Sequence, residues 1–230
     1  FAGGSGTKTN PYIIENGGQL LLMKDYSSSY FKLANDIDLD NHNWLPFEFR
    51  GELDGNNRTI YNLRIERSYD FLGIFSILLG KVRNLNVNAV SIKGNTVGTI
   101  AGAMLAKAEV RNCHIILTPN SMISGETFAG GFVGRIGTEN YDSNYEDDID
   151  VGIKECTLKS QSDEYLLLGN EGVGGIAGVA ELGRYGLVEL EIKDCSVLCN
   201  IMGGYCVGGI VGGVGVRTSK SQISSCDYEG

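Results

Sequence analysis

Two carboxylates occupy equivalent positions of neighbouring sequence repeats and form the sharpest candidate catalytic pair in the chain. They are Glu155 in the segment IKECTL and Asp194 in the segment IKDCSV. Glycoside hydrolysis generally uses two carboxyl groups roughly 5 to 10 Å apart, and stacked repeats would place this pair near the short end of that range. A catalytic role predicts raised pKa values. Both acids stand where other repeats have asparagine, so a structural role at a corner of the chain is the favoured interpretation.

Acidic side chains are densest between residues 139 and 150, where six carboxylates fall within twelve residues. Several oxygen ligands so close together can recruit Ca²⁺. Tyr141 and Tyr145 lie among them and are suited to stacking on sugar rings, so this segment is the expected contact surface for an extracellular glycan or a host or matrix protein. A solvated segment without metal is the favoured alternative. The candidate calcium ligands are Asp142, Glu146, Asp147, Asp148 and Asp150.

Other chemistries find little support in the residue types. The only histidines are His42 and His114, so no HExxH zinc helix exists, and no glycine-rich stretch is followed by the residues of a phosphate loop. Asp36, Asp38 and Asp40 lack the glycine and late glutamate of a calcium loop and fit the outer face of a strand. The net charge of −9 argues against nucleic acid, and no apolar run is long enough to span a bilayer. No cofactor is expected.

These side chains lie within two alternating sequence motifs. The first is rich in glycine and has a weaker copy at 72–76; its full copies are VGTIAG (97–102), AGGFVG (129–134), VGGIAG (173–178) and VGGIVG (207–212). The second has copies beginning at Ile60, Val82, Val110, Ile153, Ile192 and Ile223, spaced by 22, 28, 43, 39 and 31 residues. One pair of motifs makes one repeat of about 22 residues plus insertions near 137–150 and 180–188, and stacked repeats bury a shared core. The pattern predicts an all-β fold, a right-handed single-stranded parallel β-helix (β-solenoid).

The third and fourth positions of the second motif have distinct expected roles. The third is polar and is expected to turn a corner in left-handed backbone; it is Asn62, Asn84, Asn112, Glu155, Asp194 and Ser225 in successive copies. The fourth is Leu63, Leu85, Cys113, Cys156, Cys195 and Cys226, which predicts a column of reduced, buried thiols. Cys199 and Cys206 fall outside this column, and the sequence leaves open whether they pair.

A single domain over residues 1–230 is expected. Residues 1–48 form an N-terminal cap and the first strands, with a short capping helix over 18–25, and residues 49–230 form the repeats with their inserted loops. The end of a solenoid exposes core and strand edges, which is why a cap is needed.

The chain resembles bacterial GLUG-motif surface proteins over nearly its whole length. The resemblance rests on the opening FAGGSGTKTNPYIIENGGQLLLM, on FRGELDGNNRTIYNLRI, and on the VGGIAG and VGGIVG segments, each followed by a copy of the second motif. It implies an exported or cell-surface β-helix of gut Bacteroidetes, described as an adhesin, and GLUG repeats also accompany IgA-specific metallopeptidases as accessory segments. The 72–76 copy departs from the pattern because it lacks the second glycine.

The expected function is therefore a noncatalytic cell-surface or secreted module that binds a glycan or protein ligand. Two alternatives stay open. One is a carbohydrate-active β-helix enzyme, a polysaccharide lyase or glycoside hydrolase using Glu155 and Asp194. The other is an accessory spacer of a larger surface protein.

Overall fold

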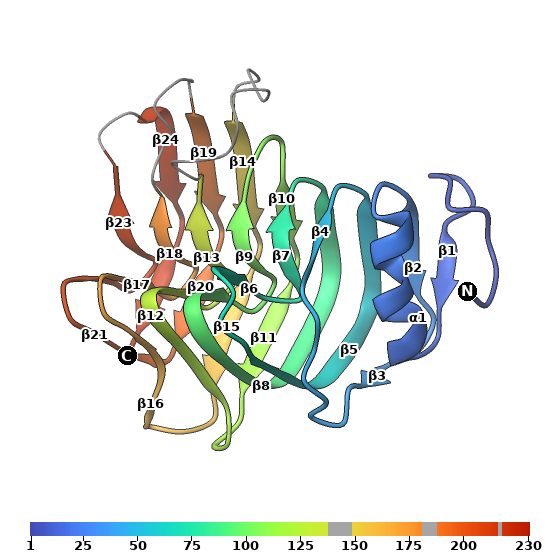
Figure 1. The fold of residues 1–230 in the computed structure, drawn as a ribbon. Coiled ribbons are helices and arrows are strands. Elements are labelled where there is room, and N and C mark those ends of the chain that lie inside the picture. Colours follow the sequence, from blue (N-terminus) through green and yellow to red (C-terminus); the bar gives the residue numbers. More distant parts are fainter. Residues whose placement is uncertain (138–148, 181–187, 216–217) are drawn as a thin grey trace.

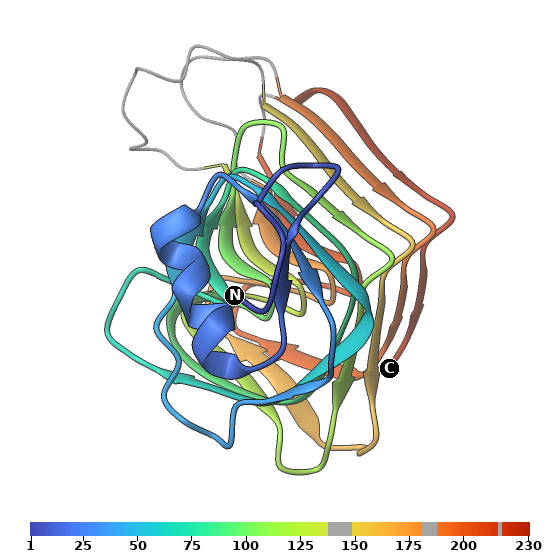
Figure 2. The ribbon, with the colours of Figure 1, turned by 90° about the vertical axis from the view of Figure 1, so that its right-hand side faces the viewer.

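The computed structural model describes residues 1–137, 149–180, 188–215 and 218–230, and nearly all of its regular structure is β-strand. The strands form two sheets in which equivalent segments of successive repeats pair in parallel. Figure 1 shows the repeats stacked from the N-terminal to the C-terminal end, and Figure 2 shows the chain winding around a common interior. The arrangement is β-helix-like.

The strand bounds follow the sequence motifs. The six-stranded sheet contains β4 (Phe47–Phe49), β7 (Phe75–Leu78), β9 (Ala101–Met104), β13 (Val133–Ile136), β18 (Ala177–Ala180) and β23 (Val211–Val214). The nineteen-stranded sheet contains β1 (Tyr12–Ile14), β2 (Tyr30–Leu33), β3 (Ile37–Asp38), β5 (Glu52–Glu66), β6 (Phe71–Leu72), β8 (Lys81–Gly98), β10 (Glu109–Arg111), β11 (His114–Leu117), β12 (Met122–Gly130), β14 (Ile149–Lys154), β15 (Thr157–Ser160), β16 (Tyr165–Gly169), β17 (Gly172–Gly174), β19 (Val188–Lys193), β20 (Ser196–Leu198), β21 (Asn200–Gly203), β22 (Cys206–Gly208), β24 (Thr218–Ser224) and β25 (Asp227–Glu229).

The second motif stacks as predicted from its Val82 copy onward, and the first motif from its Leu72 copy onward. In the second motif, Val110 pairs with Val82 on one side and with Ile153 on the other, and Ile192 pairs with Ile153 and Ile223. In the first motif the pairing runs through Leu72, Val97, Ala129, Val173 and Val207. Equivalent apolar side chains therefore form continuous columns, and a column inside the stack is shielded from water on both sides.

The placement of the Ile60 copy was wrong. Ile60 pairs with Val87, whereas the partner of Val82 is Leu53, so the interval between these repeats is 82 − 53 = 29 residues rather than 22. Leu63 accordingly pairs with Val90 and does not belong to the cysteine column. The copy was misplaced because each repeat has two corners with a similar sequence pattern. Asn62, with a φ of 57°, lies at one corner, and the other corner comes earlier in the same strand, β5.

The predicted left-handed corner is confirmed at the five later copies of the second motif. Asn84, Asn112, Glu155, Asp194 and Ser225 have φ values of 54°, 50°, 57°, 53° and 50°. Asparagine and aspartate adopt this region more readily than most residues, since their short polar side chains bond to nearby peptide groups. The turn lets the residues before and after the corner both face inward.

The cysteine column is confirmed as buried, reduced core packing for three of its four members. Cys113, Cys156 and Cys195 are buried among the apolar columns, and all three thiols are free. Cys226, in the last repeat, is only partly buried. Cys199 is buried whereas Cys206 is exposed, and both are free, so the pairing left open by the sequence is not formed.

The N-terminal helix is confirmed. Helix α1 (Gly17–Leu22) continues into a 3-10 turn, η1 (Met23–Tyr26), beside the first strands (Figures 1 and 2). Asn16 begins it: its Oδ1 accepts a hydrogen bond from the Gln19 backbone N–H (3.0 Å), and Gln19 Oε1 accepts one from the Glu15 N–H (2.8 Å). These bonds satisfy donors that the first turn leaves free. No helix in the described ranges is long and apolar enough to cross a membrane.

Candidate functional site

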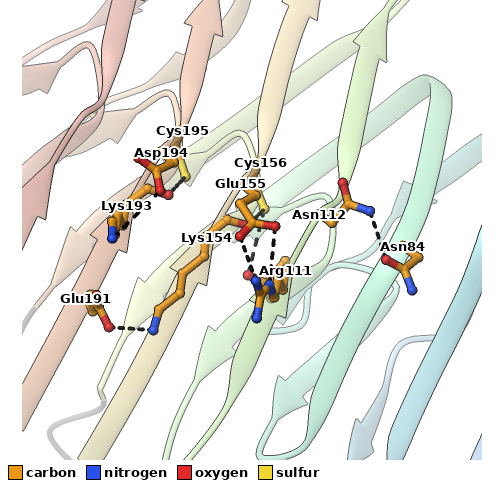
Figure 3. Close-up of polar contacts among 11 residues, drawn as sticks. Asn84, Arg111, Asn112, Lys154, Glu155, Cys156, Glu191, Lys193, Asp194 and Cys195 are labelled. Carbon is orange, nitrogen blue, oxygen red and sulfur yellow. Dashed lines mark hydrogen bonds and ion pairs between the residues drawn. The ribbon is translucent and has the colours of Figure 1, made fainter.

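The outer corner of the nineteen-stranded sheet brings the candidate acids into one row. We define the corner row as Asn84, Asn112, Glu155, Asp194 and Ser225, the five residues of left-handed backbone at this corner. The first two are joined, because Asn112 Nδ2 donates a 2.8 Å hydrogen bond to Asn84 Oδ1 (Figure 3). Glu155 and Asp194 follow on the next two repeats, as the sequence predicted.

Glu155 is hydrogen-bonded to a basic side chain, Arg111, and not to Asp194. Arg111 donates from its Nη2 to Glu155 Oε1 (2.7 Å) and from its Nε to Glu155 Oε2 (3.3 Å). Figure 3 shows the carboxylate directed at Arg111, in the preceding repeat, and away from Asp194. The hydrogen bonds and charge of Arg111 lower the pKa of Glu155. The raised pKa expected of a catalytic acid is therefore wrong for Glu155, because its ionised form is the one that the neighbouring guanidinium stabilises.

Asp194 also lies beside basic side chains. Its carboxylate is 4.0 Å from Lys193 Nζ and is about half exposed. Lys154, in the repeat before, binds Glu191, and this contact lowers the pKa of the Glu191 carboxyl (Figure 3). Glu155 and Asp194 thus lie on neighbouring repeats without any contact between their carboxylates among those the structure shows. Each carboxylate lies beside its own basic side chain, Glu155 beside Arg111 and Asp194 beside Lys193.

These contacts form part of a ladder of charges between repeats, which sequence reasoning missed. Lys81 pairs with Glu109 (3.3 Å), Arg111 with Glu155 and Lys154 with Glu191, each between neighbouring repeats. The sequence did contain a signal for these ion pairs. The second position of the second motif is basic in four consecutive copies, as Arg83, Arg111, Lys154 and Lys193. Opposite charges on neighbouring strands stabilise their pairing modestly.

The aspartates at 36, 38 and 40 lie on an outer surface, as predicted. Asp38 Oδ1 accepts hydrogen bonds from Asn62 Nδ2 and from the Asp40 backbone N–H, both 2.8 Å. These two bonds lower the pKa of Asp38. Asp36 Oδ1 accepts from the Thr59 N–H (2.9 Å). The oxygens of Asp36 and Asp38 therefore tie one repeat to the next.

Most of the predicted ligand surface lies outside the described residues. This holds for Tyr141, Tyr145, Asp142, Glu146, Asp147 and Asp148. Asp150 is described; it is exposed on β14 and pairs in register with Glu189. Within the described ranges, no group of three or more His, Cys, Asp or Glu side chains could hold a metal ion. The calcium site and the sugar-binding tyrosines stay predictions.

Two of the buried thiols, Cys156 and Cys199, lack the chemistry of nucleophiles. Burial raises the pKa of Cys199 to about 12, and burial is also the main cause that raises the pKa of Cys156. A thiol held in its protonated form reacts slowly, because the thiolate is the nucleophile. These two cysteines pack in the hydrophobic core.

The fold recurs in a solved structure. The chain is similar to the crystal structure of a "putative immunoglobulin A1 protease" from Bacteroides ovatus, with a TM-score of 0.67 and 23% identity, over 97% of this chain and 65% of that one. This likeness shows a shared fold. No family model matches the chain, so membership of the GLUG-motif proteins stays a prediction.

Two curated proteins match part of the sequence. A "Putative Gly-rich membrane protein" of Evansella cellulosilytica is 32% identical over 120 residues, which cover 45% of this chain and 14% of that protein. Halomucin of Haloquadratum walsbyi is 30% identical over 152 residues, which cover 57% of this chain and 2% of that protein. The matches thus span a small share of each relative.

Proposed function

We propose that this chain is a noncatalytic module of a cell-surface or secreted protein: a right-handed, single-stranded parallel β-helix of the GLUG type that acts as an adhesin. The observation that carries the proposal is the parallel pairing of equivalent strands from repeat to repeat. Apolar columns fill the interior, and the outer charges are neutralised from repeat to repeat. Such a body is a stiff scaffold that presents its inserted loops to a glycan or protein ligand. The same stiffness suits an accessory spacer of a larger surface protein.

The ion pair of Glu155 with Arg111 favours this proposal over a carbohydrate-active enzyme. An inverting or retaining glycosidase needs one carboxylic acid that stays protonated until it donates its proton. Glu155 has the opposite tendency, since Arg111 lowers its pKa. A lyase or hydrolase at this site would need Arg111 to release the carboxylate first.

Binding to glycan arrays and immobilised matrix proteins tests the proposal. We expect binding by the intact chain and loss of binding when residues 138–148 are replaced by a short Gly-Ser linker. A chain with residues 181–187 replaced in the same way is the matched control and should still bind. Binding by neither the intact chain nor the control would contradict the adhesin proposal, and binding that survives the 138–148 replacement would contradict the choice of surface.

A polysaccharide panel tests the enzyme alternative. The intact chain is incubated with each polymer, and reducing ends and unsaturated products are measured. The adhesin proposal expects neither product above a blank. Release of products by the intact chain, abolished in Glu155→Gln or Asp194→Asn, would overturn the noncatalytic assignment.

A further inference from the structure

An exposed aromatic ring lies on the connection between β5 and β6. Tyr69 is 54% exposed, and the Arg67 guanidinium lies over its ring, 5.9 Å from the ring centroid. Arg67 is itself held in place, because its Nε donates to the Trp44 carbonyl (2.9 Å) and its Nη2 to the Asn43 carbonyl (3.0 Å). A cation is attracted to the face of an aromatic ring. A ligand would therefore meet the opposite face of a ring that is held in place.

The loop that supports Arg67 is fixed as well. Asn43 Nδ2 donates to the Glu66 carbonyl (3.1 Å), and Asn43 Oδ1 accepts from the Glu66 N–H (3.0 Å). The indole Nε1 of the buried Trp44 donates to the Ile74 carbonyl (2.9 Å). A group that is ordered before binding loses less conformational entropy when a ligand arrives. The support of Tyr69 is thus built in advance of any ligand.

A row of polar side chains begins beside Tyr69 and continues over the next two repeats. Asp70, Asn95 and Thr127 occupy equivalent positions of three successive repeats. Thr127 Oγ1 donates to Asn95 Oδ1, and Asn95 Nδ2 lies 3.5 Å from Asp70 Oδ1. Asp70 is exposed, and Asn95 and Thr127 are half-buried. We call Tyr69, Asp70, Asn95 and Thr127 the tyrosine strip.

The tyrosine strip offers hydrogen-bond acceptors, a donor and an aromatic face together. A carboxylate has about four acceptor positions, so Asp70 has room for bonds besides the one from Asn95, and the Asn95 amide has a second N–H. Thr127 directs its only hydroxyl hydrogen at Asn95 and keeps an oxygen lone pair. A sugar hydroxyl both donates and accepts. The C–H groups on one face of a sugar ring suit the negative face of an aromatic ring.

We propose that the tyrosine strip binds a neutral sugar. The apolar face of the sugar stacks on Tyr69, and its hydroxyls bond to Asp70, Asn95 and Thr127. The Asp70 carboxylate and the net charge of −9 disfavour acidic sugars and ligands that carry phosphate. The strip shares no residue with the segment 138–148, so this proposal goes beyond the adhesin assignment and does not rest on it.

Saturation-transfer NMR with the methyl glycosides of glucose, galactose, mannose and N-acetylglucosamine tests the proposal on the intact chain. One ring and three polar groups predict weak binding, with a Kd on the order of 10 mM, and saturation concentrated on the C–H protons of one sugar face for at least one glycoside. Tyr69→Phe keeps the ring and should keep the signal, whereas Tyr69→Ala should weaken binding about tenfold. Thr127→Val should weaken it about fivefold. Tyr165→Ala, which removes a ring of the same 54% exposure on β16, is the matched control and should bind as the intact chain does.

The other outcomes overturn the proposal. No transfer to any of the four glycosides, or an undiminished signal in Tyr69→Ala, would remove the site, and loss of the signal in Tyr165→Ala would place the contact elsewhere. A methyl glucuronide that binds as well as the methyl glucoside would contradict the role of Asp70. Circular dichroism confirms that each variant is folded.

The NMR result is separate from the array test of the adhesin proposal. The chain with residues 138–148 replaced should keep the full NMR signal, and loss of that signal would overturn the strip as the site. Complexes as weak as those expected here do not survive the washing of an array. Binding to an array with no NMR response to Tyr69→Ala would therefore overturn the tyrosine strip and leave the adhesin proposal standing.

Discussion

Asn112 donates a 2.8 Å hydrogen bond through Nδ2 to the side-chain oxygen of Asn84, its equivalent in the preceding repeat. Asn84 in turn donates to Asp54 Oδ1 at 3.0 Å. Both asparagines have left-handed backbone. One side chain therefore does two things at this corner: it tolerates the turn, and it ties adjacent repeats together.

Substitution of Asn112 separates these two effects. Asn112→Ala should lower the free energy of unfolding by about 2 kcal/mol, because it loses the hydrogen bond and places alanine in left-handed backbone. Asn112→Gly loses the same bond without the steric strain and should cost about 1 kcal/mol. Urea unfolding followed by circular dichroism gives both values. If the two variants lost equal free energy of unfolding, backbone strain would not contribute to the effect of Asn112→Ala.

Close contact between repeats should make Gly174 intolerant of any side chain. A Cβ there would overlap the Ala177 carbonyl oxygen and lie 2.6 Å from Gly212 N. Gly174→Ala should cost about 3 kcal/mol or more, or prevent folding. Gly152→Ala is the matched control, since its Cβ would meet only side-chain atoms, the nearest at 3.4 Å, and should change stability by less than about 0.5 kcal/mol. Similar thermal midpoints for the two variants would contradict the close stacking.

Thiol accessibility should distinguish the cysteines. Cys206 is exposed, whereas Cys113, Cys156 and Cys199 are buried, so a thiol reagent at neutral pH should modify Cys206 rapidly and those three only after unfolding. Mass spectrometry of digested, alkylated protein identifies each site. The variant Cys206→Ser should lose the fast phase. Fast modification of Cys156 in the folded chain would show that the column is open to solvent.

The repeats could be aligned from sequence because their apolar, glycine and cysteine positions recur. The columns through Val110 and Ala129 and the corner at Asn112 follow from that pattern alone. The Ile60 copy could not be placed, because a repeat has two corners with similar sequence and only strand pairing shows that Ile60 lies opposite Val87.

The candidate site was predictable in position but not in chemistry. Glu155 and Asp194 do occupy successive corners, as their motif positions predicted. The contact that decides the state of Glu155 comes from Arg111, 44 residues earlier. That proximity exists only after the repeats have stacked, so the sequence motifs alone do not show it.

The ion pair between Arg111 and Glu155 predicts a stability that depends on pH. Arg111 holds the pKa of Glu155 below its ordinary value of 4.5, so the pair stabilises the folded chain at pH values above that of the unfolded carboxyl, and the effect is lost as the pH falls through the lowered pKa. Glu155→Gln keeps the size and the corner backbone but removes the charge. Its urea midpoint should therefore fall below that of the intact chain at about pH 7 and approach it at about pH 3. Arg111→Gln and the double variant complete the cycle, in which the second substitution should add little once the first is made. A difference between the intact chain and Glu155→Gln that is as large at the acidic pH as at neutral pH would show that the carboxylate charge is not its cause.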